Sequence, residues 1–275
     1  MRYGIIAPNL GAYADPRALI QVARTAEDAG WEALFVWDHL AFVWGPPSCD
    51  AWVALGAVAA STSRILLGSA VTPVARRRQQ VLAHEVATVA ALSGGRIVFG
   101  AGLGGVAAEF SAFGDTDDAK VRAERLDEGL EVLRRLWSGD RVTHSGPHFS
   151  VHDVALAPAP GHVPVWIGGR SAATLRRAAR WDGWIADSAA PDSMTMGPEE
   201  VAASVAVIRG RRGDAPFEIA VIGYYEPELL DAYAAAGATW WLESIHDLRG
   251  PFAEMLAVVE AGPPTHPNPP PAHGG

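Results

Sequence analysis

Short apolar runs alternate with helical segments eight times along this 275-residue chain, and this alternation constrains the fold more than any other feature. The runs are too apolar to leave one face in water, which is typical of parallel strands covered by helices. Eight such units in about 260 residues predict an α/β protein with a closed (β/α)8 barrel, the TIM-barrel architecture. The predicted strands are YGIIAP (3–8), EALFVWD (32–38), RILLGSAVT (64–72), RIVFGAG (96–102), VPVWIGG (163–169), GWIAD (183–187), FEIAVIGY (217–224) and TWWLES (239–244).

Local signals support the helices and mark the limits of the domain. Asp15 followed by Pro16 is a favourable helix start. Residues 143–162 interrupt the alternation, and we expect a hairpin or short excursion there, before the fifth strand. Residues 1–262 are predicted to form a single barrel domain, and the proline-rich residues 263–275 a disordered tail.

The composition excludes several classes of protein. A formal net charge of −9 argues against a nucleic-acid binder, which usually presents a basic face. The single cysteine, Cys49, excludes an internal disulfide and a cysteine metal cluster, and a structural or incidental role is expected for it. No apolar run is typical of a signal peptide or reaches membrane length. We therefore expect a soluble cytoplasmic protein without nucleic-acid or membrane partners.

The fourth strand ends in a glycine pattern with two interpretations. Gly100, Gly102 and Gly105 match the dinucleotide-binding spacing G-x-G-x-x-G. That motif normally opens the first strand–helix turn and needs an acidic residue ending the next strand, about 20 residues on. In this chain three strand–helix units precede the motif, and the residues about 20 positions after it are predicted to be helical. The second interpretation is therefore favoured: these glycines leave room for a flat ligand at the mouth of the barrel.

The carboxyl ends of barrel strands form the usual active site, so the residues there are the candidates. After the fifth strand, Gly168 and Gly169 allow close backbone approach, Arg170 adds charge, and Ser171 caps a helix that could attract an anion. An ordinary glycine turn with a serine cap remains the alternative. His39 follows the second strand and could bind an anionic cofactor or transfer a proton, or be structural. Its neighbour Asp38 could orient it or cap the next segment.

Other candidates give weaker signals. Arg76, Arg77 and Arg78 at a helix start could hold a second anion or form a salt-bridged surface. Three of the ten tryptophans could wall an aromatic ring at the mouth: Trp37, Trp44 and Trp166. His144, His148 and His152 recur every four residues, but Gly146–Pro147 breaks any helix that would align them on a metal. The chain has no G-x-S-x-G, P-loop or H-E-x-x-H motif.

Several stretches together resemble the bacterial luciferase-like family of flavin- and deazaflavin-dependent oxidoreductases. The resemblance covers residues 3–245 in the family's order. It is carried by FVWDHLA, RILLGSAVTPVARRR, LSGGRIVFGAGLGGVAAEFSAFGD, ERLDEGLEVLRRLWSG and VPVWIGGRSAATLRRAARWDGWI.

The resemblance implies a barrel that binds reduced FMN or the deazaflavin coenzyme F420 at its mouth. His39 matches a histidine that members place near the flavin. Ala70–Val71 falls where they often hold a non-proline cis peptide behind the ring. Gly168–Ser171 matches their phosphate loop. Gly102 is a cofactor-binding candidate on its own ground, because glycines at the end of the fourth strand leave room for a flat ligand. Many flavin-using members carry Trp-Asn or Trp-His at Gly105–Val106, and sugar-phosphate dehydrogenases a glutamate at Gly105; neither pattern is present here.

The function expected from this resemblance is a flavin-dependent oxidoreductase of a small organic substrate, with His39 and Asp38 as the catalytic residues. The main expectation is a monooxygenase supplied with reduced FMN by a flavin reductase. The alternative is hydride transfer with coenzyme F420. Outside this class, a flavin-free barrel that binds a phosphorylated metabolite and a non-catalytic relative both stay open. No metal is expected, and a homodimer is expected only because relatives commonly dimerise.

Overall fold

A computed structural model describes residues 1–190 and 193–264. In these residues a parallel barrel is closed in the strand order β3-β2-β1-β13-β12-β9-β8-β5, because β5 pairs back onto β3 at Leu67–Ile97. The eight predicted strands are therefore confirmed. They are β1 (Arg2–Ala7), β2 (Ala33–Val36), β3 (Leu66–Ser69), β5 (Ile97–Gly102), β8 (Val165–Gly168), β9 (Gly183–Ala186), β12 (Glu218–Gly223) and β13 (Trp240–Ser244).

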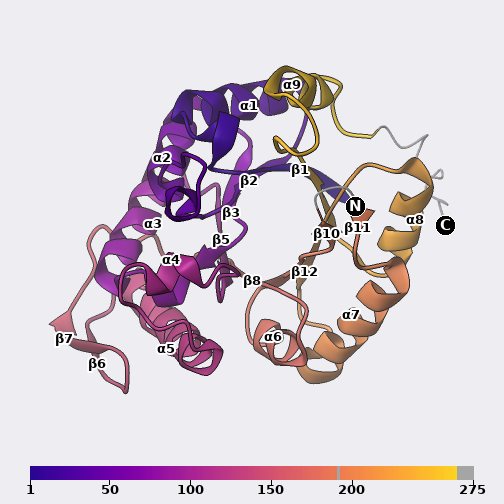
Figure 1. Cartoon of the computed structure of the whole chain (residues 1–275). Helices are drawn as coiled ribbons and strands as arrows, with labels where there is room; N and C mark the ends of the chain where they lie inside the picture. The colour runs from indigo at the N-terminus through magenta and orange to yellow at the C-terminus, as the bar shows by residue number, and fades with distance from the viewer. Residues whose placement is uncertain (191–192, 265–275) are drawn as a thin grey trace, which may run out of the picture.

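Helices form a ring outside the barrel, as Figure 1 shows. They are α1 (Pro16–Ala29), α2 (Ala51–Ser61), α3 (Gln79–Ser93), α4 (Ala108–Ser111), α5 (Ala119–Trp137), α6 (Ala172–Ala178), α7 (Pro198–Arg212), α8 (Pro227–Ala235) and α9 (Phe252–Glu260), with 3-10 turns η1 (Gly11–Tyr13), η2 (Ala41–Val43) and η3 (Val74–Arg76). The predicted start of α1 is confirmed: Asp15 accepts a hydrogen bond from the backbone N–H of Arg17 at 2.9 Å, and Pro16 is the first helical residue.

β4 (Thr72–Pro73) belongs to the barrel sheet: it follows β3 after two residues and pairs in parallel with the end of β5, at Thr72–Ala101 and Pro73–Gly102. The remaining strands form small antiparallel pairs, in one of which β10 (Ala189–Ala190) pairs with β11 (Ser193–Met194). The excursion expected at 143–162 contains an antiparallel hairpin of β6 (Val142–Ser145) and β7 (Ser150–Val154). Most of the predicted tail, residues 265–275, lies outside the described residues.

Two apolar layers hold the barrel together. One fills the space between strands and helices, and the other fills the interior of the barrel. In the interior, Trp166 stacks on Phe35 with ring centroids 5.4 Å apart and lies 5.9 Å from the ring of Trp240. Gly183 makes room for this packing, because a Cβ there would lie 2.5 Å from the Trp166 ring. Trp166 is therefore an interior packing residue and not part of the mouth, contrary to expectation.

No helix in the described part of the chain combines the length and apolar character needed to cross a membrane.

Candidate active site

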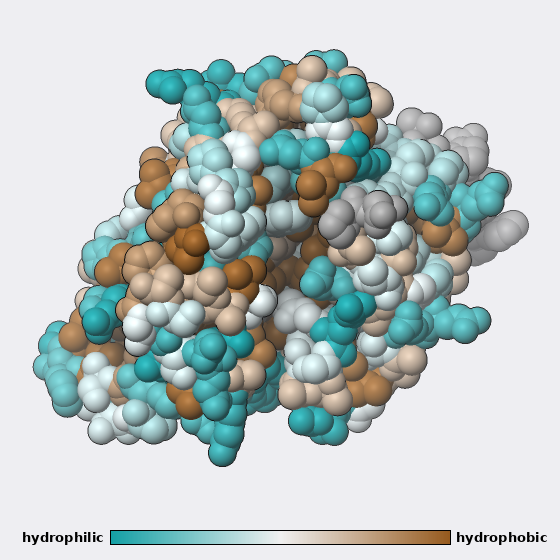
Figure 2. All heavy atoms as spheres, viewed as in Figure 1, coloured by the Kyte–Doolittle hydropathy of each residue, from teal (hydrophilic) through white to brown (hydrophobic). Residues whose placement is uncertain are grey.

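The carboxyl ends of the strands surround a central hollow that hydrophobic residues border (Figure 2). His39 follows β2 at this mouth, and its side chain is 28% exposed. Fully buried Asn9, which follows β1, fixes its backbone: the Asn9 amide donates to the His39 carbonyl at 2.9 Å and accepts from the His39 N–H at 3.1 Å. The position of His39 is therefore set by two adjacent strands.

Glu109 on α4 orients the ring of His39. One carboxylate oxygen, Oε1, lies 2.8 Å from His39 Nδ1 and accepts from Trp44 Nε1 at 3.2 Å. The other oxygen binds the Arg76 guanidinium. An ionised carboxylate can only accept, so Nδ1 carries the hydrogen, and Nε2 is left for a ligand in the mouth.

The electrostatics keep Glu109 ionised. Its side chain is 2% exposed, and burial alone would raise the pKa of its carboxyl. Hydrogen bonds from His39 and Trp44, together with the charges of His39 and Arg76, outweigh burial and hold this pKa below its usual range. A fixed negative charge therefore faces Nδ1, where it would stabilise a proton gained at Nε2.

Asp38 has a different role from the one expected. Its buried carboxylate accepts from Arg76 Nη2 at 2.9 Å and from Arg77 Nη2 at 2.8 Å, and the ring of His39 binds Glu109 instead. Asp38 is not a helix cap either, since Asp50 caps α2. Arg76 and Arg77 therefore form salt bridges with carboxylates of this protein. This agrees with the salt-bridge interpretation of these arginines and not with the binding of a second anionic ligand. Asp38 positions Arg76, which in turn holds Glu109.

The sequence interpretation missed Glu109, since the glutamate of related sugar-phosphate dehydrogenases was expected only at position 105. In the structure Gly105 is exposed, and a Cβ there would meet nothing within 4 Å. The glutamate comes from α4, four residues further along the chain. The signal that could have found it was the excess of arginines at 76–78, which required acidic partners nearby.

The predicted cis peptide Ala70–Val71 is present, and it lies beside the glycine-rich strand ends. The Val71 side chain is wedged between β5 and β8: a Cβ on Gly102 would lie 2.4 Å from it, and one on Gly168 2.5 Å. Gly102 and Gly168 therefore make room for Val71, which is half buried. The ligand space expected beside Gly102 is occupied by protein, and Ala70–Val71 itself is the surface presented to the mouth.

The loop Gly168–Ser171 contains the serine cap of one interpretation and the exposed arginine on which the anion-binding interpretation depends. Ser171 caps α6, because its Oγ accepts from the Thr174 N–H at 3.1 Å. Arg170 is exposed and donates to Thr195 Oγ1 at 3.0 Å, so its guanidinium is anchored but still open to solvent. Gly169 has φ = 118°, a conformation that favours glycine. The serine cap is established, and anion binding by the loop stays a prediction.

A second histidine that the sequence interpretation missed follows β13, which is separated from β2 only by β1 in the barrel. His246, beyond β13, is 5% exposed, and its Nε2 lies 2.9 Å from the Tyr224 hydroxyl. Its Nδ1 is buried with no hydrogen-bond partner among the described residues. Burial first, then the charge of Arg249, lowers the pKa of His246. The Trp37 ring lies between the two histidines, 5.9 Å from His39 and 6.1 Å from His246.

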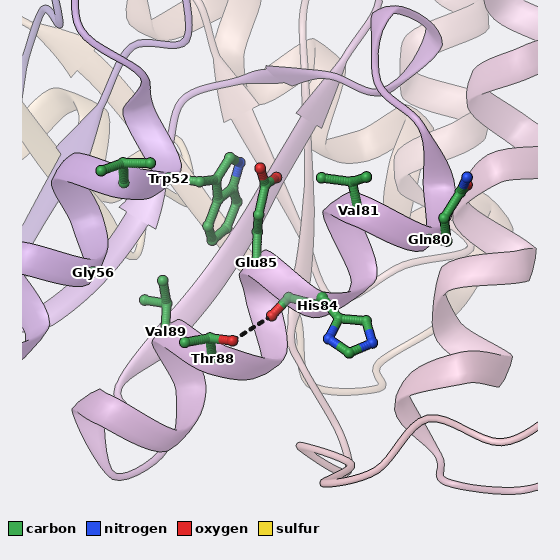
Figure 3. Close-up of a pocket in the computed structure, with 9 residues that line it drawn as sticks. Trp52, Gly56, Gln80, Val81, His84, Glu85, Thr88 and Val89 are labelled. Carbon is green, nitrogen blue, oxygen red and sulfur yellow. Dashed lines mark hydrogen bonds between the residues drawn. The ribbon is translucent and has the colours of Figure 1, made fainter.

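Other candidates are not part of this mouth. His144 and His148 bind Glu128 and Glu124, and the described residues contain no group of side chains suited to a metal. A separate groove of about 630 Å³ lies on the outside of the barrel between α2 and α3 (Figure 3). Its lining residues are Trp52, Val53, Gly56, Gln80, Val81, His84, Glu85, Thr88 and Val89.

Known proteins share this fold and much of this sequence. The F420-dependent glucose-6-phosphate dehydrogenase of Microbacterium testaceum is 34% identical over 170 residues, which are 60% of this chain and 50% of the relative. The enzyme of that name from Nocardia farcinica is 32% identical over 270 residues, 90% of this chain and 77% of the relative. The chain spans about half the length of three such dehydrogenases.

A solved structure shows the same fold. It is an F420-dependent secondary alcohol dehydrogenase in complex with an F420–acetone adduct, with a TM-score of 0.76, 18% identity, and coverage of 88% of this chain and 92% of that one. A family model described as luciferase-like monooxygenase matches residues 1–260. The chain is therefore an enzyme of the luciferase-like monooxygenase family.

Proposed function

We propose that this protein is an oxidoreductase that transfers a hydride between the hydroxyl-bearing carbon of a small molecule and coenzyme F420. The observation that carries the proposal is the His39–Glu109 pair, in which a buried carboxylate lies 2.8 Å from Nδ1 of a histidine that is 28% exposed. The named relatives depend on F420, so they favour the deazaflavin alternative over the FMN monooxygenase that was the main expectation.

The residues at the mouth fit a large anionic ring system. Ala70–Val71 offers a backbone surface for a flat ring, and the half-buried Trp37 stands beside it on the His39 side. His246 Nδ1, a buried polar atom without a partner among the described residues, could be satisfied by a polar edge of the ligand. The exposed guanidinium of Arg170 and the free N–H groups that begin α6 suit a phosphate.

When bound, the deazaflavin supplies a two-electron acceptor for a hydride from carbon. The side chains of this protein then manage the proton. An alcohol whose hydroxyl lies on His39 Nε2 gives its proton to that nitrogen while the carbon-bound hydrogen leaves with its electron pair, and a carbonyl results. Glu109 stabilises the positive imidazolium through Nδ1, and Trp44 and Arg76 hold Glu109 in place.

The test is a titration of the purified protein with oxidised F420 and with FMN, followed by alcohol-dependent F420 reduction. We expect F420 to bind more tightly than FMN. His39→Ala should lower kcat about 10²–10⁴-fold, the usual contribution of a general base, while changing the F420 Kd by less than about twofold. His84→Ala, on the exposed face of α3, is the control. Tight FMN binding without F420 binding, or full activity of His39→Ala, would contradict the proposal.

A further inference from the structure

Asp187 is a carboxylate at the mouth of the barrel that the proposed proton transfer does not use. It directly follows β9, in which Ile185 belongs to the apolar interior of the barrel, and Ala189 beyond it packs against the same interior cluster. Side chains of an extended segment alternate between its two faces, so Asp187, midway between these residues, also points towards the barrel axis. Ala186 belongs to the layer between strands and helices, as this alternation requires.

The carboxylate of Asp187 has no partner in the part of the chain that the structure describes. It makes no ion pair and accepts no hydrogen bond there, whereas Asp38, Glu109 and Glu243 each bind an arginine. Asp187 has exposed surface, yet protein atoms crowd around its carboxylate, and this burial raises the pKa of Asp187 despite the charge of Arg170. A carboxylate that has lost part of its hydration without gaining a partner is stabilised by a ligand that brings a positive charge.

Asp187 and His39 lie on opposite sides of the mouth. Four strand steps separate β9 from β2 in either direction around the closed ring, through β1, β13 and β12 or through β3, β5 and β8 (Figure 1). Strands about 4.8 Å apart and tilted by about 36° give an eight-stranded barrel a diameter of roughly 15 Å. Both side chains shorten this span, so a molecule of several bonds can contact His39 at one end and Asp187 at the other.

Aromatic side chains lie between these two ends. Trp37 packs against the interior cluster, and its ring lies 5.9 Å from that of His39. The half-buried Tyr224 follows β12, which pairs with β9, and it comes two residues after Ile222 of the interior cluster. Aromatic faces attract an ammonium group, as a carboxylate does, and the net charge of −9 draws cations towards the protein. These features together favour a positively charged ligand group at Asp187.

We infer that Asp187 binds a positively charged amino group of the substrate, and that the substrate is an amino alcohol whose ammonium lies several bonds from the hydroxyl-bearing carbon. This inference rests on the proposed hydride transfer and adds its substrate class. The reaction is unchanged: the hydride passes to F420, the hydroxyl proton passes to His39, and the amino group stays protonated. Asp187 is then a specificity-determining residue, since it touches the substrate away from the reacting carbon.

The experiment compares matched substrates at pH 7, where the amino group is protonated. It measures kcat/KM for F420 reduction by 5-amino-2-pentanol, 6-amino-2-hexanol and 7-amino-2-heptanol, and by 2-hexanol, 2-heptanol and 2-octanol, in which a methyl group replaces the ammonium. At the best length the amino alcohol should exceed its neutral counterpart by about tenfold or more, the contribution of a hydrogen bond between charged groups. In Asp187→Asn this preference should fall to near onefold or less.

Asp214→Asn is the matched control. Asp214 is an exposed aspartate in the turn between α7 and β12, at the end of the barrel opposite the mouth. Its substitution removes the same charge from the protein and should leave the preference for the amino alcohol unchanged. The preference is a ratio measured on one protein, so a poorly folded variant does not imitate the expected loss.

F420 binding, measured first by fluorescence, separates this inference from the proposed function. If the native protein binds no F420, or binds it but turns over none of the alcohols, the hydride transfer itself is overturned, and the inference with it. If neutral alcohols react as well as or better than amino alcohols, the substrate class alone is overturned. An Asp187→Asn protein that keeps the preference overturns the assignment to Asp187; if it also binds F420 more weakly, the carboxylate belongs to the coenzyme site instead.

Discussion

Replacing Glu109 with glutamine tests the proposed catalytic unit most directly. Glutamine keeps the size of the side chain and an oxygen that can accept from His39 Nδ1, but it removes the negative charge. In the native protein that charge lies 2.8 Å from Nδ1 and is shielded from water, with the side chain 2% exposed. Glu109→Gln should therefore weaken the stabilisation of the imidazolium while leaving the mouth in shape.

The size of the effect follows from the hydrogen bond that changes. A hydrogen bond to a charged group contributes about 1.5–3 kcal/mol, against about 1 kcal/mol for a neutral one. The difference, about 0.5–2 kcal/mol, corresponds to roughly a 2- to 30-fold loss of kcat. The screening of the charge by Arg76 places the expectation near tenfold.

Stability should change as well, because Arg76 loses one of its two carboxylate partners. Breaking a buried ion pair costs about 3–5 kcal/mol. Asp38 still accepts from Arg76 at 2.9 Å, so we expect about 1–3 kcal/mol, or a decrease in Tm of roughly 3–10 °C. The pKa of Glu109 is held low, so this stabilisation is complete above its unfolded pKa and is lost as the pH falls through the folded value. The Tm difference between native protein and variant should shrink in acid.

The assay measures kcat of alcohol-dependent F420 reduction, together with thermal unfolding at pH 7 and pH 3. Glu131→Gln, an exposed glutamate paired with Arg134 on α5, is the control. A Glu109→Gln protein with unchanged kcat would refute the role of the carboxylate in proton transfer, even if its Tm fell as expected.

Four further substitutions test the fold, three of them near the mouth and one, at Glu27, on α1. Gly102→Ala should destabilise the protein by about 1–3 kcal/mol, because its Cβ would lie 2.4 Å from Val71, whereas Gly105→Ala should be neutral within about 0.5 kcal/mol; thermal unfolding compares them. Ser171→Ala should cost about 1 kcal/mol through loss of the α6 cap, measured by urea unfolding. The pKa of Glu27 is lowered to about 2: burial would raise it, but hydrogen bonds from the backbone N–H groups of 63–65 outweigh burial. Glu27→Gln should therefore cost about 1–3 kcal/mol at pH 7 and progressively less from pH 4.5 towards pH 2, and an equal cost at pH 7 and pH 2 would contradict this.

The barrel could be predicted because its signals are local. Each strand is an apolar run that needs cover on both faces, and several helix starts carry a side-chain cap, as Asp15 does for α1 and Asp50 for α2. His39 and Ala70–Val71 could be located for the same reason, since a residue at a strand end lies at the mouth whatever its partners are. Such inferences need only the position of a residue within its own strand–helix unit.

The side chains that bind one another in the folded protein cannot be predicted from such local signals. Asn9 is 30 residues from His39 and Glu109 is 70, and no spacing rule joins them. Asp38 is the clearest case: it adjoins His39 in sequence, yet its carboxylate binds arginines 38 and 39 residues further along the chain. Adjacent side chains on an extended segment point to opposite sides, so a neighbour in sequence is a poor candidate for orienting a ring.

The position of Glu109 shows what the proposed chemistry requires. The proposed proton transfer needs a carboxylate at His39 Nδ1, and a position in space can be reached from more than one residue of a loop. A glutamate at Gly105 would start from an exposed position, whereas Glu109 on α4 starts beneath Trp44 and beside Arg76, so its charge is fixed before any ligand arrives. A buried arginine must be neutralised, so it identifies its carboxylate partner without reference to a family position. Arg76 is that arginine, and it points to Glu109 whichever cofactor the mouth binds.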